Sequence, residues 1–258
     1  MDVEKLTPAR IGFILLAIGA TVYSFMIPEL KLFPAPGMAR IFTWHFPCAI
    51  LCPSYLAVAS YQALRHNMGK SAGRPWAELA RMDQKLDVAM LLSVTFCILT
   101  MLTGMIFSRA QWGAWWQGDP RQTSFLLVCL IIGAYFGLRS SIADEVRRAS
   151  ACAGYVLASF LPLTFLIFVF PRIGKAGQTS SHPQDTISGA KLSFEYALSM
   201  SLVFATVLIA AIFIARLALR RFDAKTQHES DLLASDPTAP SARLVRPGTQ
   251  PVDRDATS

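Results

Sequence analysis

The most unusual feature of this sequence is a tryptophan segment at residues 112–121, which reads WGAWWQGDPR. Trp112, Trp115 and Trp116 are three of the five tryptophans in the chain. Glycines flank the adjacent pair, so the backbone can approach a ligand closely while the indole rings form a flat surface. Indole rings also gather at the edges of membranes, so an interfacial aromatic belt is the alternative interpretation. Two adjacent rings between glycines favour a platform for a flat aromatic ligand.

Two of the four histidines are placed where they could act together with the tryptophan segment. His45 stands at the beginning of an apolar segment, and His182 stands in a polar stretch that reads SSHPQD. Considered separately, His45 would be interpreted as a packing residue at a membrane interface, and His182 as a solvated loop residue. The charge pattern described below puts His66 and His228 on the opposite side of the membrane. His45 and His182 are therefore the pair expected on the same side as the tryptophans.

Two histidines and a group of indole rings are suited to holding a haem. Haem iron takes two axial ligands on opposite faces of the porphyrin, and neutral imidazole is a common donor. His45 and His182 would supply these ligands, while the three tryptophans would contact the ring. We expect this haem to be b-type and to be bound without a covalent bond to this chain.

Two charged residues belong to the same segment. Arg121 could pair with a haem propionate through a charge-assisted, bidentate contact, or with a lipid phosphate at the interface. Asp119 precedes Pro120, so it could stabilise a turn without any ligand, or it could orient a neighbouring donor. We expect Asp119 to have a structural role within the site.

The elements that must position these residues are apolar segments long enough to cross a membrane. The chain has 258 residues, of which 53% are hydrophobic and 16% charged, and its mean hydropathy is +0.41. This composition is too apolar for an ordinary water-soluble domain. A spanning helix needs roughly 20 mostly apolar residues. Six segments qualify, at 11–28, 41–63, 87–107, 124–139, 151–171 and 195–216. We therefore predict an all-α integral membrane protein, a bundle of six transmembrane helices.

The distribution of charge predicts the orientation of this bundle. The net charge of +7 does not indicate a nucleic-acid partner, because Lys and Arg lie in short segments between the apolar ones. Most of them lie near the N-terminus, in the tail, and in the loops 64–86 and 139–150. Positive charge is retained on the cytoplasmic side. Both termini are therefore predicted to be cytoplasmic, and the loops 29–40, 108–123 and 172–194 to face outward.

The two ends of the chain require separate treatment. The first apolar segment is expected to be a retained helix, because no small-residue cleavage site of a signal peptide follows it. Residues 223–258 contain several prolines and few large apolar side chains, which is typical of disorder. We predict a membrane domain over 1–222, with its tryptophan-rich external loop at 108–123, and a disordered cytoplasmic tail over 223–258.

The five cysteines all fall inside apolar segments, where cysteine commonly packs as a small apolar residue. His45, Cys48 and Cys52 share one helical face, and these side-chain types could also bind copper or zinc. No carboxylate or second histidine lies close in the sequence to complete such a site. Packing is therefore the preferred interpretation of the cysteines.

The tryptophan segment resembles a known family signature. Its spacing, W-G-x-W-W-x-x-D-x-R, is similar to the WWD signature of the haem-handling protein superfamily, which includes the CcmC family and the CcsA-type cytochrome c synthases. His45, in the context His-x-Pro, matches a histidine that opens the second helix of CcmC proteins, and His182 matches one in their last external loop. The family usually has a tryptophan before the aspartate, where this chain has Gly118. The resemblance covers roughly residues 10–220.

This resemblance implies a function and a set of partners. It implies a protein that binds haem at the periplasmic face of the bacterial cytoplasmic (inner) membrane and delivers it to a CcmE-like haem chaperone during c-type cytochrome biogenesis. It further implies the CcmA/CcmB ABC transporter and CcmD as partners, in addition to membrane lipid. Such a protein would place the haem vinyl group beside the recipient's histidine and would use no acid, base or nucleophile of its own. We therefore expect a binding and transfer protein and not an enzyme with catalytic residues.

Two other functions are compatible with a six-helix membrane protein. A CcsA-type synthase component, which joins haem directly to apocytochrome c, would be expected to have extra helices or a large partner domain. A small-molecule permease could use the kinks at Pro53 and Pro162 to line a path. However, no ionisable side chain stands in the middle of any apolar segment, where substrate sites usually have one.

Overall fold

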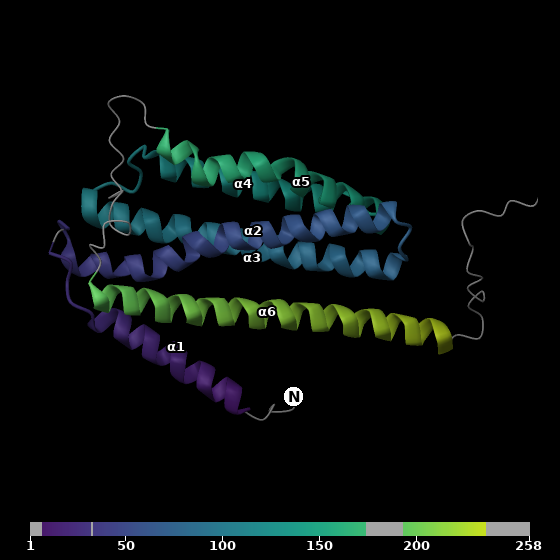
Figure 1. Cartoon of the computed structure of the whole chain (residues 1–258), viewed down its shortest axis with the longest axis horizontal. Helices are drawn as coiled ribbons and strands as arrows, with labels where there is room; N and C mark the ends of the chain where they lie inside the picture. The colour runs from purple at the N-terminus through teal and green to yellow at the C-terminus, as the bar shows by residue number, and fades with distance from the viewer. Residues whose placement is uncertain (1–6, 32, 174–192, 236–258) are drawn as a thin grey trace, which may run out of the picture. The chain divides into compact units, whose positions relative to one another are not determined.

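The computed structural model describes residues 7–31, 33–173 and 193–235, and most of these residues are helical (Figure 1). The α-helices of the described residues are α1 (Pro8–Met26), α2 (Phe42–Ser71), α3 (Trp76–Trp112), α4 (Pro120–Ser141), α5 (Glu145–Phe168) and α6 (Phe194–Ser235). Two short 3₁₀ helices, η1 (Pro36–Ile41) and η2 (Phe170–Arg172), precede α2 and follow α5. Six helices are long and apolar enough to cross a membrane, which confirms the predicted all-α, six-helix membrane fold.

The helix ends follow from local sequence. Asp119 and Asp144 are the N-cap residues of α4 and α5, and each carboxylate accepts a hydrogen bond from a backbone N–H of the first turn, at 2.7 Å. Pro120 occupies the first position of α4, where the missing N–H of proline has no helical partner to lose. Gly113 ends α3 in the left-handed conformation, with φ +79°.

Several helices are longer than the apolar segments predict. α3 begins at Trp76, although its apolar segment begins at 87, and α4 begins at Pro120, ahead of the expected 124. Hydropathy detects only the part of a helix that lies in hydrocarbon, while the polar ends continue the helix beside the membrane. Pro53 and Pro162 lie inside α2 and α5, as expected from the sequence.

The core lies among four helices. α2 packs along α3, α5 packs against α2 and α4, and α4 also contacts α3 (Figure 1). Four of the five cysteines are buried, and all five are free thiols, so they fill space in this core. The α6 side chains that pack on or within the core include Phe204, Val207, Leu208 and Ala211.

The four core helices have two distinct ends. His45, near the beginning of α2, contacts Thr103 on the last part of α3, and η2 at the end of α5 lies against α4. We call this the loop end, because the tryptophan segment connects α3 to α4 there. At the opposite end, α2 and α3 are joined by the short turn at 72–75, and Lys70 donates a hydrogen bond to Ser150 of α5.

The chain divides into two units, residues 1–219 and 220–258, and α6 contains the boundary. The predicted start of the tail, residue 223, lies within α6, which continues to Ser235. Residues 236–258 lie outside the described part of the chain. The division into a membrane domain and a disordered tail therefore stays a prediction.

Candidate functional site

His45 lies in the first turn of α2 with its ring against α3. Its Nδ1 is 3.0 Å from Thr103 Oγ1, and a Cβ atom placed on Gly104 would lie 3.2 Å from its Cε1. The Thr103 hydroxyl donates its hydrogen to the carbonyl of Leu99 at 2.7 Å. With its hydrogen engaged in this way, the hydroxyl oxygen can accept from Nδ1–H, and in that tautomer of His45 the imidazole lone pair is on Nε2. This is the tautomer that a neutral histidine needs in order to bind a metal through Nε2.

The face of α3 that holds His45 leads directly to the tryptophan segment. Phe107 lies one turn beyond Thr103, and its ring meets the edge of Trp112 at a centroid distance of 5.5 Å. Phe107 also contacts Phe33 at 5.6 Å, so the half-buried Trp112 belongs to a chain of aromatic rings. At 1.5 Å per residue, Trp112 stands about 13 Å along α3 from Thr103.

The other two tryptophans present their rings at the surface. Trp115 is 54% exposed and Trp116 is 41% exposed, although the backbone around them is held by hydrogen bonds. The Ser108 hydroxyl donates to the carbonyl of Ala114 at 2.9 Å, and the Gln122 side chain bonds to the backbone of both Trp115 and Gln117. Because the rings are exposed and the backbone is ordered, a ligand can contact the rings without a prior rearrangement of the protein.

The charged residues of the segment have different surroundings. Asp119 is 5% exposed and caps α4 by accepting from the backbone N–H of Arg121. Arg121 is half-buried in the first turn of α4. Gly118, at the position where the resembling family usually has a tryptophan, has a φ of +69°, which favours glycine. The missing ring therefore coincides with a turn that a tryptophan would adopt only with strain.

A glutamine pairing positions the connection that leads into α2. Gln111 donates from Nε2 to the carbonyl of Ala35 at 2.9 Å and accepts from the N–H of Ala35 at 3.0 Å. Ala35 immediately precedes η1, which continues into α2 and His45. On the other side of η1, Trp44 donates to the Ser24 hydroxyl of α1 at 3.1 Å.

The structure thus brings His45 and Trp112 to the same end of the molecule, on neighbouring parts of α2 and α3. His182 lies outside the described residues, so its position relative to His45 stays a prediction. Sequence reasoning missed Thr103, Gln111 and Gln122. The sequence does show two polar residues, Gln111 and Gln122, beside the tryptophans. Their hydrogen-bond partners, however, cannot be deduced from sequence spacing.

The alternative copper or zinc site receives no support from the described side chains. His45 faces Thr103, whereas the sulfur of Cys52 lies 3.9 Å from Ser93 Oγ deeper in the core. Within residues 7–31, 33–173 and 193–235, no group of three or more His, Cys, Asp or Glu side chains could hold a metal ion.

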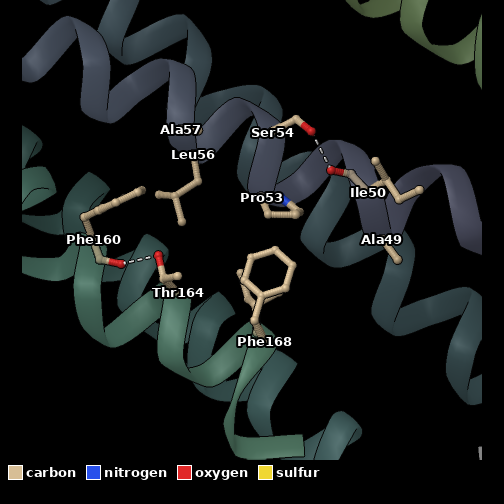
Figure 2. Close-up of a pocket in the computed structure, with 10 residues that line it drawn as sticks. Ala49, Ile50, Pro53, Ser54, Leu56, Ala57, Phe160, Thr164 and Phe168 are labelled. Carbon is tan, nitrogen blue, oxygen red and sulfur yellow. Dashed lines mark hydrogen bonds between the residues drawn. The ribbon is translucent and has the colours of Figure 1, made fainter. Parts of the chain in front are cut away.

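A cavity of about 340 Å³ lies between α2 and α5, and its lining does not include the residues predicted to bind haem (Figure 2). Its lining is Ala49, Ile50, Pro53, Ser54, Leu56, Ala57, Phe160, Thr164, Ile167 and Phe168. Ser54 and Thr164, the two hydroxyl-bearing residues, donate to the carbonyls of Ile50 and Phe160 on their own helices, at 2.8 and 2.7 Å. A polar solute would find little to bond there, so the cavity does not favour a permease for such solutes.

A buried ionic network at the opposite end was also missed. Arg139 of α4 makes two contacts of 2.9 Å with the carboxylate of Asp83 and one of 2.9 Å from Nε to Asp87 of α3. Tyr135 donates to Asp87 at 3.0 Å. This network joins the two helices that carry the tryptophan segment. The i, i+4 spacing of the two aspartates was its only signal in the sequence.

Comparison with known proteins identifies the family to which this chain belongs. The profile of the CcmC family, heme exporter protein C, matches residues 4–230. The chain therefore belongs to the heme exporter protein C family, which confirms the resemblance inferred from the tryptophan segment.

Individual relatives agree with this assignment. Heme exporter protein C of Bradyrhizobium diazoefficiens is 28% identical over 134 residues, which are 50% of this chain and 51% of the relative. The protein of the same name from Paracoccus denitrificans is 23% identical over 133 residues, 50% of this chain and 49% of the relative. The cytochrome c biogenesis protein CcsA of Prochlorococcus marinus is 35% identical over 79 residues, 28% of this chain and 25% of the relative. The chain spans about half the length of these two relatives named heme exporter protein C.

Proposed function

We propose that this protein binds haem at the outer face of the cytoplasmic membrane and delivers it to a CcmE-like haem chaperone during c-type cytochrome biogenesis. The observation that carries the proposal is the arrangement at the loop end. His45 contacts, through Nδ1, the same face of α3 that ends in the tryptophan segment. Membership of the heme exporter protein C family supports a role in haem handling.

In this proposal each residue of the site has one task. His45 and His182 are the axial ligands of the haem iron, and Trp112, Trp115 and Trp116 contact the porphyrin. Arg121 pairs with a propionate, and Asp119 keeps the first turn of α4 in place beneath the segment. The haem is b-type and is held without a covalent bond to this chain, so it can leave.

The contribution of the protein to haem attachment is positioning. It holds the haem with a vinyl group facing the recipient's histidine, and it excludes other orientations. The proposed location is the bacterial inner membrane with the haem site on the periplasmic side. The proposed partners, besides CcmE and membrane lipid, are CcmA, CcmB and CcmD, and the name of the family supports an export assembly of this kind.

The test is a visible absorption spectrum of the protein purified in detergent, together with variants of each histidine. We expect a six-coordinate, bis-histidine haem spectrum, and we expect His45→Ala and His182→Ala each to weaken haem retention. His228→Ala is the matched control, because this histidine lies on the exposed part of α6. In cells, both ligand variants should also reduce the covalent haem adduct of the chaperone. Haem content that is unchanged in both variants would contradict the assignment.

A further inference from the structure

Gln122 makes a two-ended contact with the backbone of the tryptophan segment. Its Nε2 donates to the carbonyl of Trp115 at 3.2 Å, and its Oε1 accepts from the N–H of Gln117 at 2.9 Å. Gln122 as a whole is 8% exposed, although it belongs to the first turn of α4. Its amide therefore turns back over the segment and bonds to the backbone on both sides of Trp116.

The exposure of the two rings makes this contact important. Trp115 and Trp116 are 54% and 41% exposed, so much of each ring is not held in place by surrounding protein. The direction in which such a side chain points depends largely on the backbone that carries it. Backbone groups outside regular structure need other partners, and here one side chain supplies a partner to two of them. A hydrocarbon side chain of similar size could fill the same space but could not make either bond.

The neighbouring contacts act on other parts of the segment. Asp119 bonds to the backbone of Arg121, which lies within α4, and Ser108 bonds to Ala114, just before the ring pair. The side chain of Gln117 is exposed and reaches the carbonyls of Trp112 and Ala114 only at 3.4 Å. Among the described side chains, Gln122 is thus the one that bonds to the backbone on both sides of Trp116.

We infer that Gln122 is a positioning residue, which holds the backbone of Trp115 to Gln117 so that the two indole rings are preorganised for a flat ligand. The contact itself is a property of the ligand-free protein. Its consequence for haem affinity rests on the proposed function. A preformed platform raises affinity because binding does not have to order the rings.

The first measurement is hydrogen exchange of the backbone amide of Gln117 in the ligand-free protein, purified in detergent. Gln122→Ala removes the acceptor of this amide, so exchange should accelerate roughly tenfold. Gln122→Glu keeps an acceptor oxygen, so the exchange rate should stay near that of the unchanged protein. Gln117→Ala, which retains the backbone N–H, is the matched control and should exchange slowly. Equal exchange in Gln122→Ala and the unchanged protein would overturn the inference.

The second measurement is haem titration of the same variants, with folded yield as the control for stability. Gln122→Ala should lose about tenfold in affinity, whereas Gln117→Ala should lose little. If Gln122→Ala does not fold, Gln122→Glu and the control Gln117→Ala still test the positioning role. Gln122→Glu loses the bond to Trp115, so it should bind haem more weakly than Gln117→Ala. Affinity that falls equally in Gln122→Glu and Gln117→Ala would refute the positioning role. If the unchanged protein binds no haem, the proposed function fails, but the exchange result still decides whether Gln122 holds the segment.

Discussion

His45 Nδ1 lies 3.0 Å from Thr103 Oγ1, and the Thr103 hydroxyl is itself committed to the carbonyl of Leu99. Together these two contacts favour the tautomer of His45 that carries its proton on Nδ1. The residue that orients the proposed ligand is thus on α3, whereas the ligand itself is on α2.

Thr103→Val is therefore expected to weaken haem binding without removing a ligand. Valine keeps the shape of threonine but cannot accept the Nδ1 proton, and loss of a partner that orients a ligand typically costs 10–100-fold in metal affinity. Thr103→Ser should retain most of the affinity. The measurement is haem titration in detergent, with Thr95→Val as the control, because Thr95 bonds only to its own helix and is exposed on α3. Equal affinities of the two valine variants would contradict the role of Thr103.

Replacement of Trp115 and Trp116 by alanine should deplete bound haem and block its transfer, while protein abundance stays near normal. Burial of large aromatic rings against an apolar ligand contributes on the order of 1–3 kcal/mol, so haem occupancy should fall roughly tenfold or more. A phenylalanine pair should partly restore both properties. Trp76→Ala, at the beginning of α3 and the opposite end of the core, is the control. Normal haem occupancy in the alanine pair would favour the aromatic belt.

Gly118→Ala should destabilise the turn of the tryptophan segment. The φ of Gly118 is +69°, and an L-residue with a Cβ would be strained there by roughly 1–2 kcal/mol, although the surrounding space is open. Gly133→Ala provides the contrast, since that glycine lies within α4, also has open space, and gains helix propensity on substitution. Thermal unfolding and hydrogen exchange of residues 113–119 would show the difference. A Gly118→Ala variant that exchanges as slowly as Gly133→Ala would show that the strain is unimportant.

Arg139→Gln should lower the stability of the core by about 3–5 kcal/mol, because it leaves the buried carboxylate of Asp83 without its partner. The side chains of Arg139 and Asp83 are only 15% and 10% exposed. Arg74→Gln breaks a pair that is 49% and 51% exposed and should cost less than about 1 kcal/mol. Thermal unfolding in detergent measures both. The double variant Asp83→Asn/Arg139→Gln should recover part of the loss, and additive losses would show that the two residues do not interact.

Membrane topology can be tested at the turn between α2 and α3. A reporter inserted after Gly73 should read cytoplasmic, as should one near Ser235, whereas one within 174–181 should read external. The reason is the concentration of Lys and Arg around the first position and in the tail. An external reading at Gly73 would invert the orientation and place His45 on the cytoplasmic side.

The amino-acid sequence by itself determined the membrane class, the six helices, the tryptophan segment and the family. These are local properties, because hydropathy over some 20 residues and a ten-residue signature can be read without knowing what any segment contacts. It also placed His45 at the beginning of α2 and Asp119 before Pro120, where the structure finds a helix cap.

Only the tertiary structure decided which side chains control the candidate site. Thr103 and His45 are 58 positions apart, Gln111 and Ala35 are 76 apart, and Arg139 and Asp83 are 56 apart. Contacts of this kind depend on which helices are neighbours and on how each is rotated about its axis. Helix rotation is set by the packing of many side chains at once, and no local pattern in the sequence specifies it.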